Sequence, residues 1–530
     1  MTGRIIRPSQ FILSYGVGSI IETDRGSRII PVFQRWGKYF LSSYDNKKID
    51  DASALNQLLN YSDKPQIFSI STNSDLNKND SKDIYKLSVF PRWGVCMNHS
   101  GVPILGQINE QGVFYCSYCK KENNTPKVTG IRFVSACSKG HLEDVDWPFF
   151  VHLDNNYECD GILFGWTGEG QASNDLRIYC IKCRSQIRLS DIYKLSKDNK
   201  IKCGGNFAES KRNGKGCSLN AKLLLRSGSN LRIPEILTSL CIPYRDSELY
   251  RILSKQPYYT TLSLLEHLKK NKTVEDLTEL LRISMSTNLH IKENEVKEIE
   301  SFSDKELSDV SGQLVRDNTK GKVTEHDVKN DEYIALKNAS VYGHPPEHNG
   351  KPSKFEVEKT KIREIDAAST GWKLPFTVTP IKTLSVILVQ LGYRRMVGPD
   401  TGDLVKTFYE DDDGNSWFPG IETIGEGVFI RLKHDGLLPS CNESWKIWMK
   451  IFENRYNQNS KDYHKFHPFF VWWHSLSHRI INSLAIDSGY SSASIRERIY
   501  LRMNEINPNM LLEEFSFTQH RLVEMEHLED

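Results

Sequence analysis

The chain has 530 residues, a net charge of +2 and a hydrophobic content of 38%, a composition typical of a globular protein and unlike a disordered or collagenous one. Its length exceeds what a single hydrophobic core supports and predicts three or four domains. No apolar run reaches the roughly 18 residues that cross a bilayer, and the first residues lack the apolar core of a signal peptide. We therefore expect a cytoplasmic protein without a membrane partner.

The order of sequence patterns predicts an α+β multidomain protein with four consecutive regions. Residues 1–90 mix short β-like runs with polar stretches and form an N-terminal mixed α/β region. Residues 91–225 are rich in cysteine and form a zinc-binding region that contains a zinc ribbon. Residues 226–345 form a helical region with a charged linker, and residues 346–530 form a mixed β/α C-terminal domain.

Helical spacing supports the last two regions. In the helical region, Leu277 and Leu281 are four residues apart, as on one face of a helix. Residues 291–335 are rich in charge and poor in aromatic residues, which predicts an exposed linker. Near the end of the chain, Ser494 and Glu497 have the spacing of a capping box, which predicts that a helix begins there.

Cysteine is the most informative component of the composition. Nine of the 11 cysteines lie within residues 96–217. Because a reducing cytosol disfavours disulfides, clustered thiols in a chain without a signal peptide indicate metal ligands.

The first candidate site combines a C-x2-H pair, Cys96 and His99, with a C-x2-C pair, Cys116 and Cys119. Zinc takes four such ligands in a tetrahedron, and a close pair lets one turn supply two of them. The apolar residues within 100–115 can form the hairpin of a zinc ribbon. The spacing predicts a zinc site with three cysteines and one histidine.

The second candidate site combines the C-x2-C pair Cys180 and Cys183 with the more widely spaced Cys203 and Cys217. The residues between the last two are mostly glycine, lysine, arginine and asparagine, and such a segment can bring both sulfurs to one ion. The alternative is a lone pair with two free thiols. A closed four-ligand site leaves no position for a catalytic water, so these zinc ions are expected to be structural.

A third set consists of Cys137, His141, His152 and Cys159. A C-x3-H pair with a further histidine and cysteine can hold a third zinc ion. The spacing is unusual, and four residues with structural roles explain it equally well. We therefore expect two zinc ions, with a third left open.

Positive charge is concentrated in residues 177–232, which carry fourteen Lys and Arg against three acids, a net charge of +11. Such a block on a zinc module is typical of phosphate-backbone contact and predicts DNA binding. The alternative is an ordinary solvated surface. The best candidates lie in or beside the second zinc module: Arg184, Lys202, Lys211, Arg212 and Lys215.

Motifs for catalysis are absent from the sequence. None of the four Gly-Lys steps continues as a P-loop. His474 and His478 share one helical face, but residue 475 is not the glutamate of an H-E-x-x-H motif, so two packed histidines are the preferred interpretation. We expect no catalytic residue; the alternative is a metal-dependent nuclease or hydrolase centred on His141, His152 or the pair His474 and His478.

Several segments, in the same order along the chain, resemble the DrmB family of subunits of the bacterial DISARM anti-phage system. These segments are Arg7–Gln10, Gly16–Ile20, Phe90–Trp93, Arg132–Asp144, Ser239–Pro243, Trp417–Glu422, Gly425–Phe429, His474–His478 and Ser488–Arg498. The last two also resemble a helicase-associated domain of unknown function.

The resemblance implies a non-catalytic subunit that partners a DrmA-like helicase or ATPase and assists its engagement of DNA in phage defence. A pure assembly scaffold is a further alternative. The chain departs from the family pattern at His99, where a second cysteine is usual, and near its end, where the acidic segment Leu511–Asp530 stands in place of a strand and a Cys-rich segment. The C-terminal domain is therefore expected to be shortened, or completed by another polypeptide.

Overall fold

The computed structural model describes most of the chain. The described residues are 6–35, 48–72, 85, 87–99, 102–153, 159–167, 176–210, 216–243, 248–268, 273–286, 290–319, 325–345, 353–361, 376–395, 397, 402–432, 443–455, 467–488, 495–503 and 511–519.

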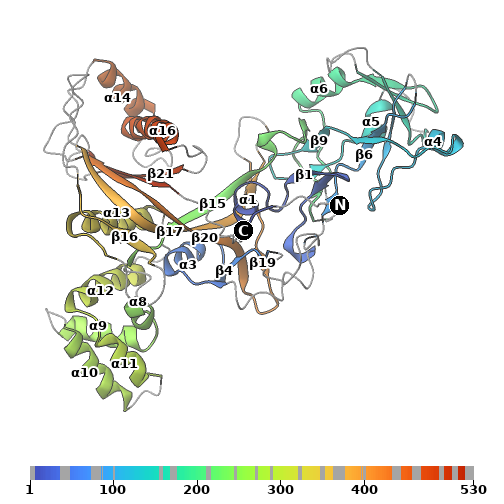
Figure 1. The fold of residues 1–530 in the computed structure, drawn as a ribbon. Coiled ribbons are helices and arrows are strands. Elements are labelled where there is room, and N and C mark those ends of the chain that lie inside the picture. The colour runs from blue at the N-terminus through green and yellow to red at the C-terminus, as the bar shows by residue number, and fades with distance from the viewer. Residues whose placement is uncertain are drawn as a thin grey trace, which may run out of the picture. The chain divides into compact units, whose positions relative to one another are not determined.

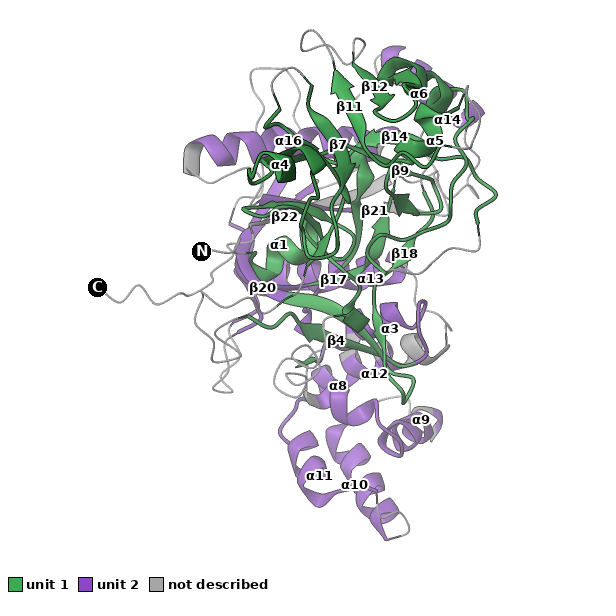
Figure 2. Ribbon diagram, turned by 90° about the vertical axis from the view of Figure 1, so that its right-hand side faces the viewer, with its two compact units in different colours: residues 1–49, 64–237, 388–421 green, residues 50–63, 238–387, 422–530 purple. Residues whose placement is uncertain are grey.

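The chain folds into helices and several β-sheets, which confirms the predicted α+β multidomain class (Figure 1). It divides into two compact units, each assembled from segments that are not consecutive (Figure 2). Unit 1 comprises residues 1–49, 64–237 and 388–421, and unit 2 comprises residues 50–63, 238–387 and 422–530. The finer division into four regions stays a prediction.

Unit 1 contains three sheets built of short strands. In the first, β2 (Gly26–Ile29) lies between β1 (Ile20–Thr23) and β5 (Ser88–Val89). In the second, β9 (Phe133–Ala136) lies between β10 (Leu142–Glu143) and β14 (Lys222–Leu225). The third has six strands in the order β13 (Gln186–Arg188), β12 (Arg177–Cys180), β11 (Phe164–Thr167), β7 (Ile104–Gln107), β6 (Trp93–Cys96) and β8 (Val128–Gly130).

Aromatic residues and cysteines share the core of this cysteine-rich region. Trp93, Trp147 and Phe164 are buried in one cluster that also includes Cys137 and Cys180. The helices of the unit are short, so the apolar area that they bury is limited, and metal clusters are a usual supplement to such a core. These helices are α1 (Pro8–Leu13), α4 (Ser117–Lys121), α5 (Trp147–Val151) and α6 (Leu189–Lys197), with 3-10 turns at Phe33–Arg35 and Ser229–Leu231.

A large mixed sheet contains the longest strands of the chain. Its main order is β15 (Ile233–Leu240), β17 (Phe376–Arg394), β20 (Ser416–Leu432), β22 (Leu511–Gln519) and β21 (Ile495–Met503). The boundary between the two units falls within β15, β17 and β20. Shorter strands pair with β17 or β20: β4 (Pro65–Ser69), β16 (Phe355–Val357), β18 (Val405–Lys406) and β19 (Tyr409–Glu410). A further short strand, β3 (Lys48–Ile49), pairs with β4.

Unit 2 contains the predicted helical region. Leu277 and Leu281 are fully buried on one face of α10, as their spacing predicted. The expected linker over 291–335 is wrong: this stretch forms helices, and Val296 and Leu307 are buried within it. Apolar residues recur at helical spacing between the charges, which is enough to build a buried face. The helices are α3 (Ala52–Leu58), α8 (Glu248–Leu253), α9 (Tyr258–Leu268), α10 (Val274–Met285), α11 (Glu293–Ile299), α12 (Asp304–Thr319) and α13 (Glu325–Tyr342).

The C-terminal part of unit 2 differs from the prediction at residue 495. The helix expected after Ser494 is instead strand β21, which is paired with β22 along its whole length. In β21, Ile495 and Ile499 are buried on the side that packs against Trp473, and this alternation of period two is typical of a strand. The helix on which His474 and His478 were expected to share a face is confirmed as α16 (Pro468–Ser488), and α14 (Glu443–Arg455) precedes it.

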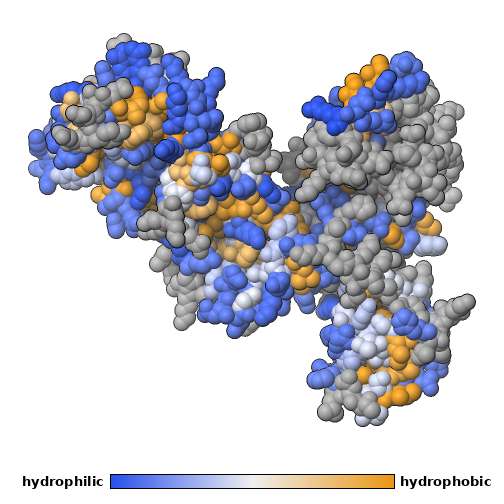
Figure 3. Space-filling model, turned by 180° about the vertical axis from the view of Figure 1, so that it is seen from behind, coloured by the Kyte–Doolittle hydropathy of each residue, from blue (hydrophilic) through white to orange (hydrophobic). Residues whose placement is uncertain are grey.

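Hydrophobic residues on the surface occur in separate patches among hydrophilic residues (Figure 3). Exposed apolar side chains include Ile447, Ile451 and Ile486. Among the described residues, no helix combines the length and the apolar character that crossing a membrane requires.

Candidate metal centres

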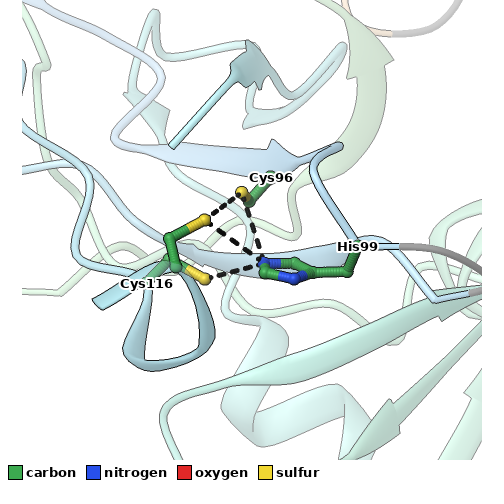
Figure 4. Close-up of side chains that lie close together, drawn as sticks. Cys96, His99 and Cys116 are labelled. Carbon is green, nitrogen blue, oxygen red and sulfur yellow. Dashed lines mark hydrogen bonds between the residues drawn. The ribbon is translucent and has the colours of Figure 1, made fainter. Parts of the chain in front are cut away.

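The first candidate centre, cluster 1, lies at the end of the hairpin formed by β6 and β7. Cys96 is the last residue of β6, His99 follows it, Cys116 is the residue that precedes helix α4, and Cys119 lies in that helix. Figure 4 shows Cys96, His99 and Cys116 pointing toward one another. The Sγ of Cys96 is 3.6 Å from both His99 Nε2 and Cys119 Sγ, and His99 Nε2 is 3.0 Å from Cys116 Sγ. The structure thus brings together the four residues that the sequence grouped.

Cluster 2 consists of Cys137, His141, Cys203 and Cys217. Cys137 directly follows β9 and His141 directly precedes β10, so one tight turn presents both. Gly140 within this turn has a φ of 83°, which glycine adopts without strain. His141 Nδ1 is 3.3 Å from Cys137 Sγ and 3.5 Å from Cys203 Sγ.

A carboxylate that the sequence analysis did not single out supports cluster 2. The Oε1 of Glu143 lies 3.3 Å from Cys203 Sγ and accepts a hydrogen bond of 3.1 Å from the Gly205 backbone N–H. Its Oε2 accepts a hydrogen bond of 2.9 Å from Asn206 Nδ2. Glu143 therefore fixes the loop that follows Cys203. The only sequence signal for this role is its position two residues after His141.

Cluster 3 consists of His152, Cys159, Cys180 and Cys183. His152 ends helix α5, Cys180 ends β12, and the sulfurs of Cys159 and Cys180 are 3.7 Å apart. His152 Nδ1 lies 2.7 Å from the carbonyl oxygen of Pro148 and donates to it, because a carbonyl only accepts. The Nε2 of His152 is buried and makes no hydrogen bond. This leaves the Nε2 lone pair free for a metal ion, as in histidines whose other nitrogen is held by a carbonyl.

The structure corrects how the sequence grouped the second and third sets. The sequence placed Cys180 and Cys183 with Cys203 and Cys217, but the two pairs lie in different clusters. Pairing of β11 with β12 sets Phe164 opposite Cys180 and so brings the segment after Cys159 to that pair. Cys203 and Cys217 instead join the turn between β9 and β10. His141 and His152, expected in one site, are correspondingly in different ones.

The donor sets fit zinc. In a tetrahedral zinc site with Zn–S bonds of about 2.3 Å, the sulfurs are about 3.7 Å apart. The S···S distances of 3.6 Å and 3.7 Å in clusters 1 and 3 match this separation and far exceed a disulfide bond. Each cluster offers three cysteines and one histidine, so a bound ion would have four protein ligands and no open position.

Local hydrogen bonds favour thiolates, which are the form that binds a metal. In cluster 2, the hydrogen bond with Cys203 lowers the pKa of Cys137 to about 5, and the same contact raises the pKa of Cys203. In cluster 3, a hydrogen bond of 3.2 Å with Ser185 lowers the pKa of Cys183 to about 6. Hydrogen bonding thus favours the thiolate at one sulfur of each of these two clusters, whereas burial raises the pKa of Cys180 in cluster 3 and raises that of Cys119 in cluster 1 to about 11.

The candidate DNA-binding residues are only partly described. Arg184 and Lys202 are exposed, and each lies next to a cluster cysteine. Lys211, Arg212 and Lys215 lie outside the described residues. Of the other basic residues in 177–232, several are exposed on unit 1, namely Arg177, Lys182, Arg188, Lys194, Lys197 and Lys200.

Two arginines of the basic block have structural roles instead. The Arg226 guanidinium donates to the carbonyl oxygen of Gly130 at 2.8 Å and pairs with Glu22. Arg232 donates from Nε to the carbonyl oxygen of Val17 at 2.8 Å. The net charge of residues 177–232 therefore overstates the positive charge that is available to bind a ligand.

Comparison with known proteins gives two matches. A family model described as a domain of unknown function, DUF8724, matches residues 7–233. The DISARM protein DrmB of Bacillus paralicheniformis is 26% identical over 398 residues, which is 70% of this chain and 64% of that protein. The match thus spans less than two thirds of the relative. The resemblance of the C-terminal domain to helicase-associated domains stays a prediction, but the match to this DrmB protein confirms the predicted resemblance of the chain to the DrmB family.

Proposed function

We propose that the chain is a zinc-stabilised, non-catalytic subunit of a bacterial anti-phage defence complex, and that it helps a helicase or ATPase partner to engage DNA. The similarity to the DISARM protein DrmB is the observation that carries this proposal. A DrmA-like helicase is the partner that the family resemblance implies.

Zinc has a structural role in this proposal. The twelve ligands of clusters 1, 2 and 3 all lie in unit 1, and Cys137, Cys180 and Cys203 belong to its buried core. Four protein ligands exclude a metal-bound water, which hydrolysis at such a centre would require. We therefore assign His141 and His152 as ligands of structural ions. These residues are two of the three centres considered for a nuclease.

DNA engagement is attributed to the exposed cations around clusters 2 and 3. Arg184 and Lys202 lie beside Cys183 and Cys203, so the zinc ions would fix the backbone that carries these two side chains. Lys211, Arg212 and Lys215 lie in the same stretch between Cys203 and Cys217. Contacts of this kind go to phosphates and carry no base specificity.

The proposal is tested by adding the purified chain to a DrmA-like helicase and measuring DNA-stimulated ATP hydrolysis and DNA binding. We expect the chain alone to bind labelled DNA at low salt without cleaving it, and to raise the affinity of the helicase for DNA. A complex that forms without any change in DNA affinity would support the scaffold alternative instead.

The same labelled DNA, incubated with the chain and Mg²⁺ or Zn²⁺, tests the nuclease alternative. Metal-dependent cleavage that disappears in His474→Ala would overturn the proposal. Cleavage that persists in this variant but disappears in His141→Ala or His152→Ala would also overturn the proposal, and the absence of cleavage supports the non-catalytic role.

A further inference from the structure

Two histidines and a glutamate meet on unit 2, away from the cysteine clusters. His474 and His478 lie one turn apart on α16, and Glu497 lies on β21, the strand on which α16 packs (Figure 1). One nitrogen of each imidazole and one carboxylate oxygen all lie within 4.8 Å of one another. The side chains of His474, His478 and Glu497 are 44%, 60% and 22% exposed, so the group is open to solvent.

Glu497 occupies an apolar face of β21. Side chains alternate along a strand, so Glu497 shares its face with Ile495 and Ile499, which pack against Trp473 of α16. The opposite face carries Arg498, whose guanidinium pairs with Glu332. A carboxylate between two buried isoleucines is unfavourable unless a cation or hydrogen bonds compensate it.

Ser477 holds this carboxylate in one orientation. The hydroxyl of Ser477 is fully buried and hydrogen-bonds to Oε2 of Glu497, and it also lies 2.6 Å from the carbonyl oxygen of His474. The other oxygen, Oε1, is 2.5 Å from His474 Nδ1 and 4.0 Å from His478 Nε2. One oxygen of Glu497 is therefore positioned by the protein, and the other is directed at both histidines.

One nitrogen of the group has no hydrogen-bond partner. This atom, His474 Nδ1, is buried, and Glu497 Oε1 lies 2.5 Å from it. The Nε2 atoms of the two histidines are 3.3 Å apart. Two imidazoles and a carboxylate this close together form a usual ligand set for a first-row transition-metal ion.

We propose that His474, His478 and Glu497 bind a divalent transition-metal ion of the zinc class, with Ser477 as a positioning residue. Two imidazoles and one carboxylate suit zinc and its first-row neighbours better than magnesium or calcium, which prefer oxygen ligands. Three protein ligands leave at least one coordination position for water or an anion, unlike the closed cysteine clusters.

Cobalt provides the test because its spectrum reports its ligands. The full chain, with zinc in the cysteine clusters, is washed with a mild chelator and titrated with Co²⁺. We expect one equivalent of Co²⁺ to bind without sulfur-to-metal charge-transfer bands, and added azide to change its spectrum because a coordination position is open. Glu497→Gln and His478→Ala, which alter exposed or half-buried side chains, should each remove this equivalent and leave the zinc content unchanged.

Matched variants separate ligation from structure. His267→Ala removes an exposed histidine of α9 in the same unit and should bind Co²⁺ as the wild-type chain does. Ser477→Ala should keep the stoichiometry and weaken binding by about 10- to 100-fold, the effect of removing a group that orients a ligand. Equal Co²⁺ binding by wild type, Glu497→Gln and His478→Ala, or no binding by wild type, would overturn the proposal.

Discussion

The guanidinium of Arg395 and the carboxylate of Glu209 form an ion pair in the interior of unit 1, with Nη2 3.4 Å from Oε2 and side chains only 0% and 2% exposed. Arg395 also donates from Nε to the carbonyl oxygen of Gly140 at 2.9 Å, and from Nη1 to that of Leu231 at 2.7 Å. Gly140 lies in the turn between Cys137 and His141. The buried arginine at the end of β17 therefore holds the turn that presents two ligands of cluster 2.

The substitution Arg395→Met should destabilise unit 1 and weaken metal binding at cluster 2. The substitution leaves the Glu209 carboxylate buried without its cation, which typically costs about 3–5 kcal/mol. Chemical denaturation of the metal-loaded chain measures the loss of stability, and elemental analysis measures the metal.

Two further variants check the cause. Arg394→Met removes a partly exposed arginine that pairs with Glu235, so it should cost at most about 1 kcal/mol. Arg395→Met combined with Glu209→Gln should recover part of the loss, because the carboxylate that lost its Arg395 partner is then neutral. If the single and double variants were equally unstable, the buried charge would not be the reason for the effect.

Cys116→Ser should prevent folding of the cluster 1 region rather than reduce a single activity. Structural zinc contributes about 10 kcal/mol or more to folding, which exceeds the whole stability of most domains. We expect an insoluble or protease-sensitive product. The control is Cys241→Ser, a buried cysteine outside the clusters whose thiol lies 3.6 Å from Asp51, and it should remain soluble with its full zinc content.

The composition of the three clusters gives a test that needs no mutation. As the structure groups them, each cluster has three cysteines and one histidine. The grouping made from sequence would give one site with four cysteines and one with two cysteines and two histidines. After exchange with ¹¹³Cd, three resonances in the range of S₃N ligation are expected. Resonances typical of S₄ and S₂N₂ ligation would contradict the structural grouping.

Short-range ligand pairs could be predicted from the sequence, but their combination could not. Cys96 with His99 and Cys180 with Cys183 are local, because one turn of the chain sets their spacing. Which pairs share an ion depends on strand pairing, and the pairing of β11 with β12 brings Cys159 to Cys180. No local pattern encodes that contact.

The same limit explains the error at residue 495. Ser494 and Glu497 have the spacing of a helix cap, but the alternation of Ile495 and Ile499 with Arg496 and Arg498 fits a strand equally well. Pairing with β22, a long-range contact, selects the strand. Glu497 was missed as a partner of His474 for this reason, since only a strand places it against α16.

Salt dependence provides the sharpest test of the proposed DNA contacts. If Arg184, Lys202, Lys211, Arg212 and Lys215 each neutralise one phosphate, five contacts at about −0.7 each give a log–log slope near −3.5 on single strands. Reversing Lys211, Arg212 and Lys215 to Glu removes three contacts, so the slope should fall to about −1.4 and affinity should drop to a similar extent for all sequences. Fluorescence anisotropy at several salt concentrations measures both quantities.

A charge-matched control distinguishes local contacts from net charge. Reversing Lys255, Lys297 and Lys446 to Glu changes the charge of the chain by the same amount, but these exposed lysines lie on unit 2 and pair with acids there. Because screening limits the reach of a charge to about 10 Å at 0.1 M salt, the control should keep the wild-type slope. If both triple variants lost DNA affinity equally, DNA binding would depend on the overall charge of the chain. If the variant at Lys211, Arg212 and Lys215 kept the wild-type slope, the contact surface would lie elsewhere on the chain or on the helicase partner.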